Sequence, residues 1–286
     1  MTVQALRMFL LQYGAERVPR SLSLRDGPSF LGWEPLFGVL VETTAGWVLF
    51  DTGMGREALD AEETQRSYAA AAIDAGRDPF KQTWALYPTP PDPARWNWGL
   101  PGDPLVAALQ TVGLTIRDLS LVVISHLHLD HSGGIPLLAE AGVPVAVQRA
   151  EMDFAHSGLA VFAEGFRASD WSHQRTRWGL LDGDTDVAPG VSVLSTPGHT
   201  PGHSSLKVEL PQSGTWLFAA DAADLGQNLL DRVACGYCAG GPEDERAAIR
   251  SLDRLLTEAA DADARLVPGH DQLVLNAVRH PRDGHR

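Results

Sequence analysis

The chain has 286 residues, of which 44% are hydrophobic and 21% are charged, the balance of a folded globular protein rather than a disordered one. Its 23 Lys and Arg residues are outnumbered by 36 Asp and Glu residues, giving a formal net charge of −13. This acidic balance disfavours binding to nucleic-acid phosphates and to anionic membrane surfaces. The two cysteines, Cys235 and Cys238, are too few for a disulfide framework.

The amino-terminal residues do not resemble a targeting segment. Residues 1–13 contain a short apolar run, but they lack a long apolar region and a cleavage site of small residues. No stretch of the sequence approaches the roughly 20 apolar residues that a membrane span needs. We therefore expect a cytoplasmic protein with no membrane partner.

Short apolar runs rich in β-branched residues, each followed by turn residues, predict strands. They lie at residues 37–43, 47–50, 121–125, 143–148, 191–195, 205–209, 216–220 and 265–267. Helical patterns occur at residues 57–75, 104–112 and 242–259. Clusters of strands with helices between them predict a layered α/β architecture, in a single domain that spans residues 1–286.

Two aromatic-rich segments, residues 80–103 and 151–180, look like surface insertions into this framework. They carry Trp84, Tyr87, Trp96 and Trp98 in the first segment and Phe154, Phe162, Phe166, Trp171 and Trp178 in the second. Two interpretations stay open. The aromatic side chains fill a secondary core, or they form an apolar wall over a ligand cleft.

The strongest chemical signal is the heptapeptide at residues 125–131, with His126, His128, Asp130 and His131 in the pattern His-x-His-x-Asp-His. It follows an apolar run typical of a buried strand, and two glycines behind it allow a tight backbone turn. Imidazole nitrogens and carboxylate oxygens are the ligands of Zn²⁺ and related divalent ions. The heptapeptide therefore predicts a metal site rather than a chance group of surface histidines.

Three more predicted strands lead into residues of the same types. His199 and His203 follow the strand at 191–195, Asp221 follows 216–220, and His270 follows 265–267. Each residue alone is weak evidence, because a single histidine is more often structural. Ligands of open α/β sheets lie outside the carboxyl ends of the strands, so these residues are suitable partners for the first cluster.

In these motifs, together with Leu49-Phe50-Asp51-Thr52-Gly53, the chain resembles the metallo-β-lactamase-fold hydrolase superfamily over residues 49–270. The resemblance implies an α/β fold of four layers, an αββα sandwich, with a two-metal site at one edge. It implies two divalent metal ions per chain, most simply Zn²⁺. The implied ligands are His126, His128 and His199 for one metal and Asp130, His131 and His270 for the other, with Asp221 as the bridge. Asp51 resembles a residue that orients a ligand, and His203 resembles a structural residue.

Within the superfamily, the chain resembles the N-acyl homoserine lactonases, because the seven-residue ligand set is complete and includes no cysteine. Those enzymes usually carry a Tyr three residues after the bridging Asp, where this chain has Asp224. That Tyr holds the substrate carbonyl or the leaving oxygen, so its absence bears on the substrate. Cys235 and Cys238 form a lone Cys-x-x-C pair, which we interpret as two reduced thiols. Tyr237, between them, is a possible replacement for the absent Tyr.

The resemblance implies that a hydroxide bridging the two metals attacks the carbonyl of a lactone, either an N-acyl homoserine lactone or a related one. Asp130 is the first proton-shuttle prediction and Asp224 the second. The alternative is an aryl ester or organophosphate triester hydrolase on the same site, since an easily displaced phenolate needs less help from a Tyr. Thioester hydrolysis, nuclease action, diiron redox chemistry and a catalytically inactive binding module are each less well supported. A small-molecule substrate is the expected partner, and a homodimer is a family-level expectation.

Overall fold

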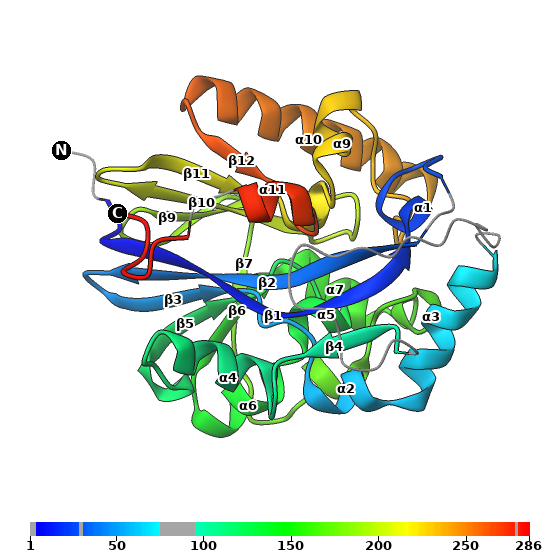
Figure 1. The fold of residues 1–286 in the computed structure, drawn as a ribbon, viewed down its shortest axis with the longest axis horizontal. Coiled ribbons are helices and arrows are strands. Elements are labelled where there is room, and N and C mark those ends of the chain that lie inside the picture. Colours follow the sequence, from blue (N-terminus) through cyan, green and yellow to red (C-terminus); the bar gives the residue numbers. More distant parts are fainter. Residues whose placement is uncertain (1–3, 29–30, 75–94, 278–279) are drawn as a thin grey trace.

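The computed structural model describes residues 4–28, 31–74, 95–277 and 280–286, which form two facing β-sheets with helices on their outer sides. Within these residues the larger sheet has the strand order β4-β1-β2-β3-β5-β6-β7 and the smaller one β12-β11-β10-β9-β8. Helices α9 and α10 cover the smaller sheet, α11 contacts β2 at the side, and α2, α4, α5, α6 and α7 lie on the outer side of the larger sheet (Figure 1). The predicted four-layer αββα sandwich is confirmed.

The strands are β1 (Arg7–Pro19), β2 (Leu31–Thr43), β3 (Gly46–Phe50), β4 (Asn97–Gly99), β5 (Leu119–Val123), β6 (Pro144–Gln148), β7 (Arg177–Leu181), β8 (Thr185–Ala188), β9 (Val191–Ser195), β10 (Ser204–Leu210), β11 (Gly214–Phe218) and β12 (Arg265–Val267). The α-helices are α1 (Arg20–Ser23), α2 (Arg56–Asp60), α3 (Glu62–Asp74), α4 (Pro104–Thr111), α5 (Leu129–Ser132), α6 (Ile135–Ala141), α7 (Arg149–His156), α8 (Ala168–Trp171), α9 (Gly226–Asp231), α10 (Pro242–Asp261) and α11 (Gln272–Ala277). Short 3₁₀ turns lie at Ile116–Asp118, Ala160–Phe162 and Ala220–Ala222.

Each of the eight predicted strands overlaps a strand of the structure, and two of the three predicted helices are α4 and α10. The third, at 57–75, is two helices, α2 and α3, because the backbone is extended at Ala61 and interrupts the helical hydrogen bonds. Residue 75 lies outside the described residues. Strands β1, β4, β7 and β8 were not predicted, because their sequences lack compact β-branched runs.

Alternation along the central strands of the larger sheet produces two separate apolar layers. Val39 and Val41 point toward the smaller sheet, whereas Leu40 between them points toward the outer helices. The same alternation places Phe50 between the sheets and Leu49 under the helices. Successive side chains of a strand point to opposite faces, so a sheet covered on both faces is apolar throughout.

The described parts of the two aromatic-rich segments differ in their surroundings. Trp84 and Tyr87 lie outside the described residues. Trp98 lies on edge strand β4, which pairs with β1, and it packs against Ala15 and Trp33. In the second segment Trp171 is buried in the outer core.

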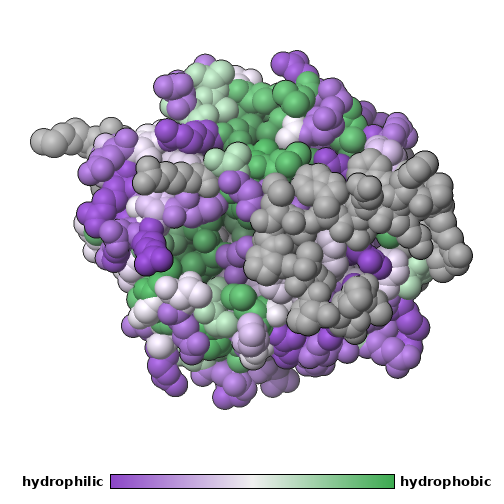
Figure 2. Space-filling model, viewed as in Figure 1, coloured by the Kyte–Doolittle hydropathy of each residue, from purple (hydrophilic) through white to green (hydrophobic). Residues whose placement is uncertain are grey.

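The surface in Figure 2 is hydrophilic around most of its rim, and hydrophobic side chains gather over the layer of α10 and α11. Among the described residues, no helix combines the length and the apolar character needed to cross a membrane.

Candidate metal centre

Histidine and aspartate side chains meet at the edge where strands of both sheets end. Strand β5 leads into His126, β9 into the loop of His199, β11 into Asp221 and β12 into His270. Two groups of possible metal ligands result. They are His126, His128, His199 and Asp221 in the first group, and Asp130, His131, Asp221 and His270 in the second, with ligand atoms within 4.8 Å of one another in each. The structure therefore brings together all seven residues of the predicted ligand set.

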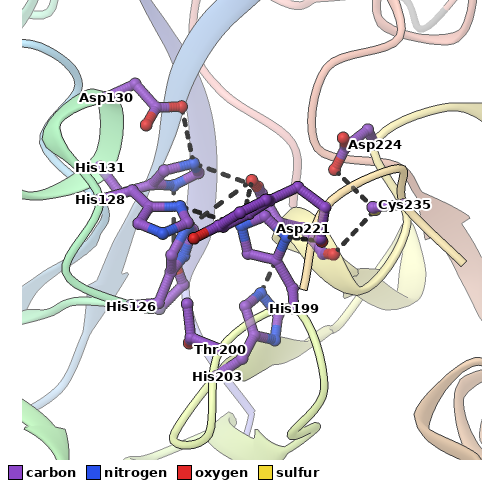
Figure 3. Close-up of polar contacts among 12 residues, drawn as sticks. His126, His128, Asp130, His131, His199, Thr200, His203, Asp221, Asp224 and Cys235 are labelled. Carbon is purple, nitrogen blue, oxygen red and sulfur yellow. Dashed lines mark hydrogen bonds and ion pairs between the residues drawn. The ribbon is translucent and has the colours of Figure 1, made fainter. Parts of the chain in front are cut away.

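Asp221 belongs to both groups because its two carboxylate oxygens face in different directions. Its Oδ2 lies 3.3 Å from Nε2 of His199 and 3.7 Å from Nε2 of His126. Its Oδ1 lies 3.1 Å from Nε2 of His131 and 3.0 Å from Nε2 of His270. Figure 3 shows this carboxylate between the histidine rings. One oxygen per group is the geometry that a bridging carboxylate requires.

The donor set fits divalent metal ions. Nε2 of His126, which faces Asp221, is buried and has no hydrogen-bond partner among the described residues. A buried nitrogen without a partner is costly unless something accepts its lone pair. Imidazole and carboxylate ligands suit Zn²⁺ and related transition metals.

Hydrogen bonds on the far side of the ligand histidines, away from the metal centre, fix the orientation of their rings. Nδ1 of His270 lies 3.1 Å from the carbonyl oxygen of Pro35, and Nδ1 of His199 lies 3.2 Å from that of Tyr237. In this geometry each Nδ1–H donates to a carbonyl, which leaves the Nε2 lone pair facing the centre.

Asp51 holds the ring of His131 and the loop after β5 that carries it. Its Oδ2 lies 2.9 Å from Nδ1 of His131, and its Oδ1 accepts a hydrogen bond from the backbone N–H of Ser125 at 2.7 Å. Asp51 has a φ of 62°, in the left-handed region, directly after strand β3. The backbone turn at this position directs the carboxylate toward the end of the neighbouring strand, β5. This contact agrees with the orienting role that the resemblance implies.

His203 is close to the first group but both of its nitrogens have other partners. Nδ1 lies 3.0 Å from the carbonyl oxygen of Thr196, and Nε2 accepts a hydrogen bond from the backbone N–H of Asp221 at 3.0 Å. Burial lowers the pKa of His203 to about 3, which keeps the ring neutral and Nε2 free to accept. His203 thus positions the backbone of Asp221.

Glu151 was not recognised from the sequence. Its fully buried carboxylate accepts hydrogen bonds from the backbone N–H of Leu127, the hydroxyl of Thr200 and the backbone N–H of Gly202, at 2.9, 2.7 and 3.0 Å. It therefore ties the His126 loop to the His199 loop. Glu151 lies in the first turn of helix α7 among ordinary charged residues, so no local pattern marks it.

Burial and neighbouring charges shift the pKa values of the ligand histidines in two opposite directions. Burial lowers the pKa of His126 well below its ordinary value and that of His128 to about 3, so both rings are neutral. At His131 and His270 burial has the same effect, but nearby carboxylates outweigh it and raise the pKa. Burial would raise the pKa of Asp221, yet the surrounding histidines hold it well below its usual range. The first ligand group thus offers neutral imidazoles, and Asp221 offers an ionised carboxylate.

A cavity of about 330 Å³ opens onto both groups. Its lining includes His128, Asp130, Asp221 and His270, and Phe166 from the second aromatic segment. The ring of Phe166 lies edge-on to that of His128, with 4.8 Å between centroids. Trp98 does not belong to this lining, so of these two aromatic residues only Phe166 has the position of a cleft wall.

Asp224 lines the same cavity but belongs to neither ligand group. Its Oδ1 accepts a hydrogen bond from Sγ of Cys235 at 3.1 Å, as Figure 3 shows. Cys235 and Cys238 are both buried and free, as the prediction of reduced thiols requires. Burial, reinforced by the charge of Asp221, raises the pKa of Asp224 well above its ordinary value.

Tyr237 lies beside the first ligand group. Its ring centroid is 6.1 Å from that of His128 and 6.2 Å from that of His199. Its hydroxyl oxygen accepts a hydrogen bond from the backbone N–H of Glu164 at 2.9 Å, which leaves the hydroxyl proton free to be donated. Since Tyr237 also lines the cavity, it offers a hydrogen-bond donor beside the first ligand group.

Comparisons with known proteins agree with this geometry. Residues 31–270 match the family model of the metallo-beta-lactamase superfamily. An N-acyl homoserine lactonase of Bacillus cereus is 31% identical over 238 residues, which cover 83% of this chain and 81% of the relative. The N-acyl homoserine lactonase AttM of Azorhizobium caulinodans is 34% identical over 172 residues, 58% of this chain and 63% of that protein.

Solved structures of N-acyl homoserine lactone hydrolases are similar to this chain over nearly its whole length. A mutant of Bacillus thuringiensis AiiA with N-decanoyl-L-homoserine bound at its active site superposes with a TM-score of 0.77 at 27% identity, covering 98% of each chain. An N-acyl homoserine lactone hydrolase with N-hexanoyl-L-homoserine at its catalytic metal centre gives 0.74 at 28% identity and the same coverage.

Proposed function

We propose that this chain, which belongs to the metallo-β-lactamase superfamily and is a metal-dependent hydrolase, opens lactone rings on a centre of two divalent metal ions, most simply Zn²⁺. The observation that carries the proposal is the carboxylate of Asp221, with one oxygen toward each group of histidines. The relatives that are N-acyl homoserine lactonases support the same reaction.

Each ion would have its own set of residues. His126, His128 and His199 would hold one, and Asp130, His131 and His270 the other, with Asp221 between them. When bound, two such ions lower the pKa of a water molecule toward 7 and polarise a carbonyl. The remaining contributions come from side chains of the chain itself.

Asp130 is the residue that we assign to proton transfer. It lines the cavity, and its Oδ2 lies 3.1 Å from Nε2 of His131. As the oxygen of water bonds to the carbonyl carbon and the ring C–O bond breaks, the water loses a proton and the leaving alkoxide gains one. An Asp130 oxygen can accept the first proton and return it to the alkoxide, which gives the hydroxy acid.

Tyr237 is the hydrogen-bond donor that we assign to the substrate. Its hydroxyl already accepts from Glu164, so its own proton can be donated to the carbonyl or ring oxygen of a lactone. Asp224 remains our second assignment for proton transfer, because burial raises its pKa and only its Oδ1 is engaged by Cys235. The aryl ester and organophosphate triester alternative was based on the missing Tyr, and Tyr237 weakens that basis.

The test combines metal content with a hydrolysis panel on protein purified without chelator. We expect close to two equivalents of transition metal and turnover of acyl homoserine lactones. Asp221→Ala should hold one equivalent or less and lose activity at least about a hundredfold, whereas Asp253→Ala, an exposed control, should change neither. One equivalent in the wild type would contradict the two-metal centre. Faster turnover of paraoxon or p-nitrophenyl esters than of every lactone would favour the alternative.

A further inference from the structure

The backbone turn that carries Asp221 has an unfavourable conformation. Ala220, directly before it, has a φ of 46°, in the left-handed region. This conformation is unfavourable for a residue with a side chain, and it persists only where surrounding contacts hold it. The backbone contacts of Asp221 help to hold the turn. Its N–H donates a hydrogen bond to Nε2 of His203 at 3.0 Å, which leaves its carbonyl to be accounted for.

The thiol of Cys235 contacts that carbonyl. Its Sγ lies 3.1 Å from the backbone carbonyl oxygen of Asp221 and 3.1 Å from Oδ1 of Asp224, and Figure 3 shows both contacts. Cys235 is buried, with 2% of the residue exposed. In the described part of the chain, no other group donates a hydrogen bond to either oxygen. A thiol is a weak donor, and here one S–H serves two acceptors at the two ends of a four-residue turn.

Both ends of this turn belong to the metal centre. At one end, Asp221 directs one carboxylate oxygen toward each ligand group. At the other end, the backbone carbonyl of Asp224 accepts a hydrogen bond from the backbone N–H of His270 at 2.7 Å. A displacement of the turn would therefore move the bridging carboxylate and the backbone of a second ligand together.

The backbone on either side of Cys235 is anchored to the segment after β1. The N–H of Gly236 donates to the carbonyl of Leu22 at 2.8 Å, and the carbonyl of Ala234 accepts from the N–H of Arg25 at 2.9 Å. A Cβ atom at Gly236 would lie 2.8 Å from the same Leu22 oxygen, so this close approach requires glycine. The position of the thiol is therefore fixed by contacts that do not involve the ligand loops.

Cys238, three residues later, has different surroundings. It is also buried, but it packs in an apolar cluster with Ala234 and Ala248, and its Sγ has no hydrogen bond in the described part of the chain. A buried free cysteine ordinarily acts as a small apolar side chain. That description fits Cys238, whereas the thiol of Cys235 contacts two oxygens.

We infer that Cys235 is a positioning residue for the metal centre, acting through its S–H group. Together with His203 it fixes Asp221 from both sides of its backbone, and it holds Oδ1 of Asp224. This inference rests on the proposed bridging role of Asp221. The role needs the thiol as a hydrogen-bond donor, and the volume of the side chain alone does not fulfil it.

The first test compares Cys235→Ala, which removes the donor, with Cys235→Ser, which keeps one. We expect Cys235→Ala to lose about tenfold in Zn²⁺ affinity, measured by competition with a chelator, and about tenfold in kcat, with KM changed less than about threefold. Cys235→Ser should stay within about threefold of the wild type in affinity and kcat. The matched control, Cys238→Ala, removes the other buried thiol and should change neither. Equal losses in Cys235→Ala and Cys235→Ser would mean that packing alone matters, and no loss in Cys235→Ala would mean that the thiol holds nothing. Either result would overturn the inference.

The infrared S–H stretching band tests the hydrogen bond without metal or turnover. The chain has two cysteines, so the wild type shows two bands and Cys238→Ala shows that of Cys235 alone. Donation of the S–H proton lowers the stretching frequency. We therefore expect the Cys235 band of metal-free protein at a lower wavenumber than the Cys238 band. Coincident bands would overturn the inference, and this measurement does not need Cys235→Ala to fold.

The two tests also separate this inference from the proposed reaction. If the Cys235 band is lowered and Zn²⁺ affinity depends on the donor at position 235, but no lactone is hydrolysed, the proposed reaction fails and the positioning role stands. If lactones are hydrolysed on two metal ions but the bands coincide, the proposed function stands and the positioning role fails.

Discussion

The backbone N–H of Asp221 donates a hydrogen bond to Nε2 of His203 at 3.0 Å, and this contact fixes the residue whose carboxylate faces both ligand groups. His203 can accept only as a neutral ring, which its burial ensures. The histidine closest to the first ligand group without belonging to it therefore supports the bridge from behind.

His203→Ala removes this acceptor and leaves a buried N–H group without a partner. We expect a loss of about 1–3 kcal/mol in the free energy of unfolding and of about 10–100-fold in kcat/KM. Chemical denaturation and elemental analysis of the same preparations provide the measurement. The control is His156→Ala, at an exposed position on α7. Full activity and metal content in His203→Ala would show that Asp221 is positioned by other contacts.

Asp51→Asn tests the ring contact behind the second ligand group. Asn tolerates the left-handed backbone at this position and keeps the size of the side chain, but it offers one acceptor oxygen for two donors, Nδ1 of His131 and the backbone N–H of Ser125. We expect a drop of about 10–100-fold in metal affinity or kcat/KM. Competition with a chelator measures the affinity, and an unchanged value would refute the orienting role of Asp51.

Phe166 and Trp98 are expected to behave differently, because one lines the cavity and the other packs against Ala15 and Trp33. Phe166→Ala should raise KM for acyl lactones, more for longer chains, since each buried methylene is worth about 0.8 kcal/mol. Trp98→Ala should lower the free energy of unfolding by about 2 kcal/mol, since its side chain is half-buried, and should leave KM unchanged. Kinetics over a series of chain lengths, with urea unfolding of both variants, separates the two effects. The assignment is wrong if Trp98→Ala shows the chain-length dependence.

Glu16 and Glu34 are buried and lie opposite each other on β1 and β2, and they should make the stability of the metal-free protein depend on pH. Burial raises the pKa of Glu16 to about 8 and that of Glu34 to about 7, from 4.5. Between pH 4.5 and the raised pKa values, the native state binds more protons than the unfolded state. The free energy of unfolding therefore falls as pH rises from 4.5 toward 8. We expect Glu16→Gln/Glu34→Gln to flatten this dependence by at least about 3 kcal/mol, which is what the smaller of the two shifts alone is worth. Urea unfolding in the presence of chelator measures it, and identical slopes in both proteins would contradict the expectation.

The sequence determined the chemistry of the centre and most of the central strands. The predicted ligand residues follow strands marked by apolar β-branched runs, directly as at His126 and Asp221, or on the short helix α5 that comes next in the case of Asp130 and His131. Such local patterns are readable because burial on both faces requires apolar residues throughout a strand, and metal binding requires His and Asp where it ends.

Only the tertiary structure decided the contacts between segments far apart in the sequence. Glu151 joins two ligand loops, and Tyr237 reaches the cavity from a loop that no motif connects to it. The pairing of Glu16 with Glu34 depends on the register of β1 and β2, and β1 itself was not predicted. The sequence on either side of a charged residue can be the same whether its side chain is exposed or buried. Its meaning therefore depends on which other segments fold against it, which is set by global packing rather than by its neighbours along the chain.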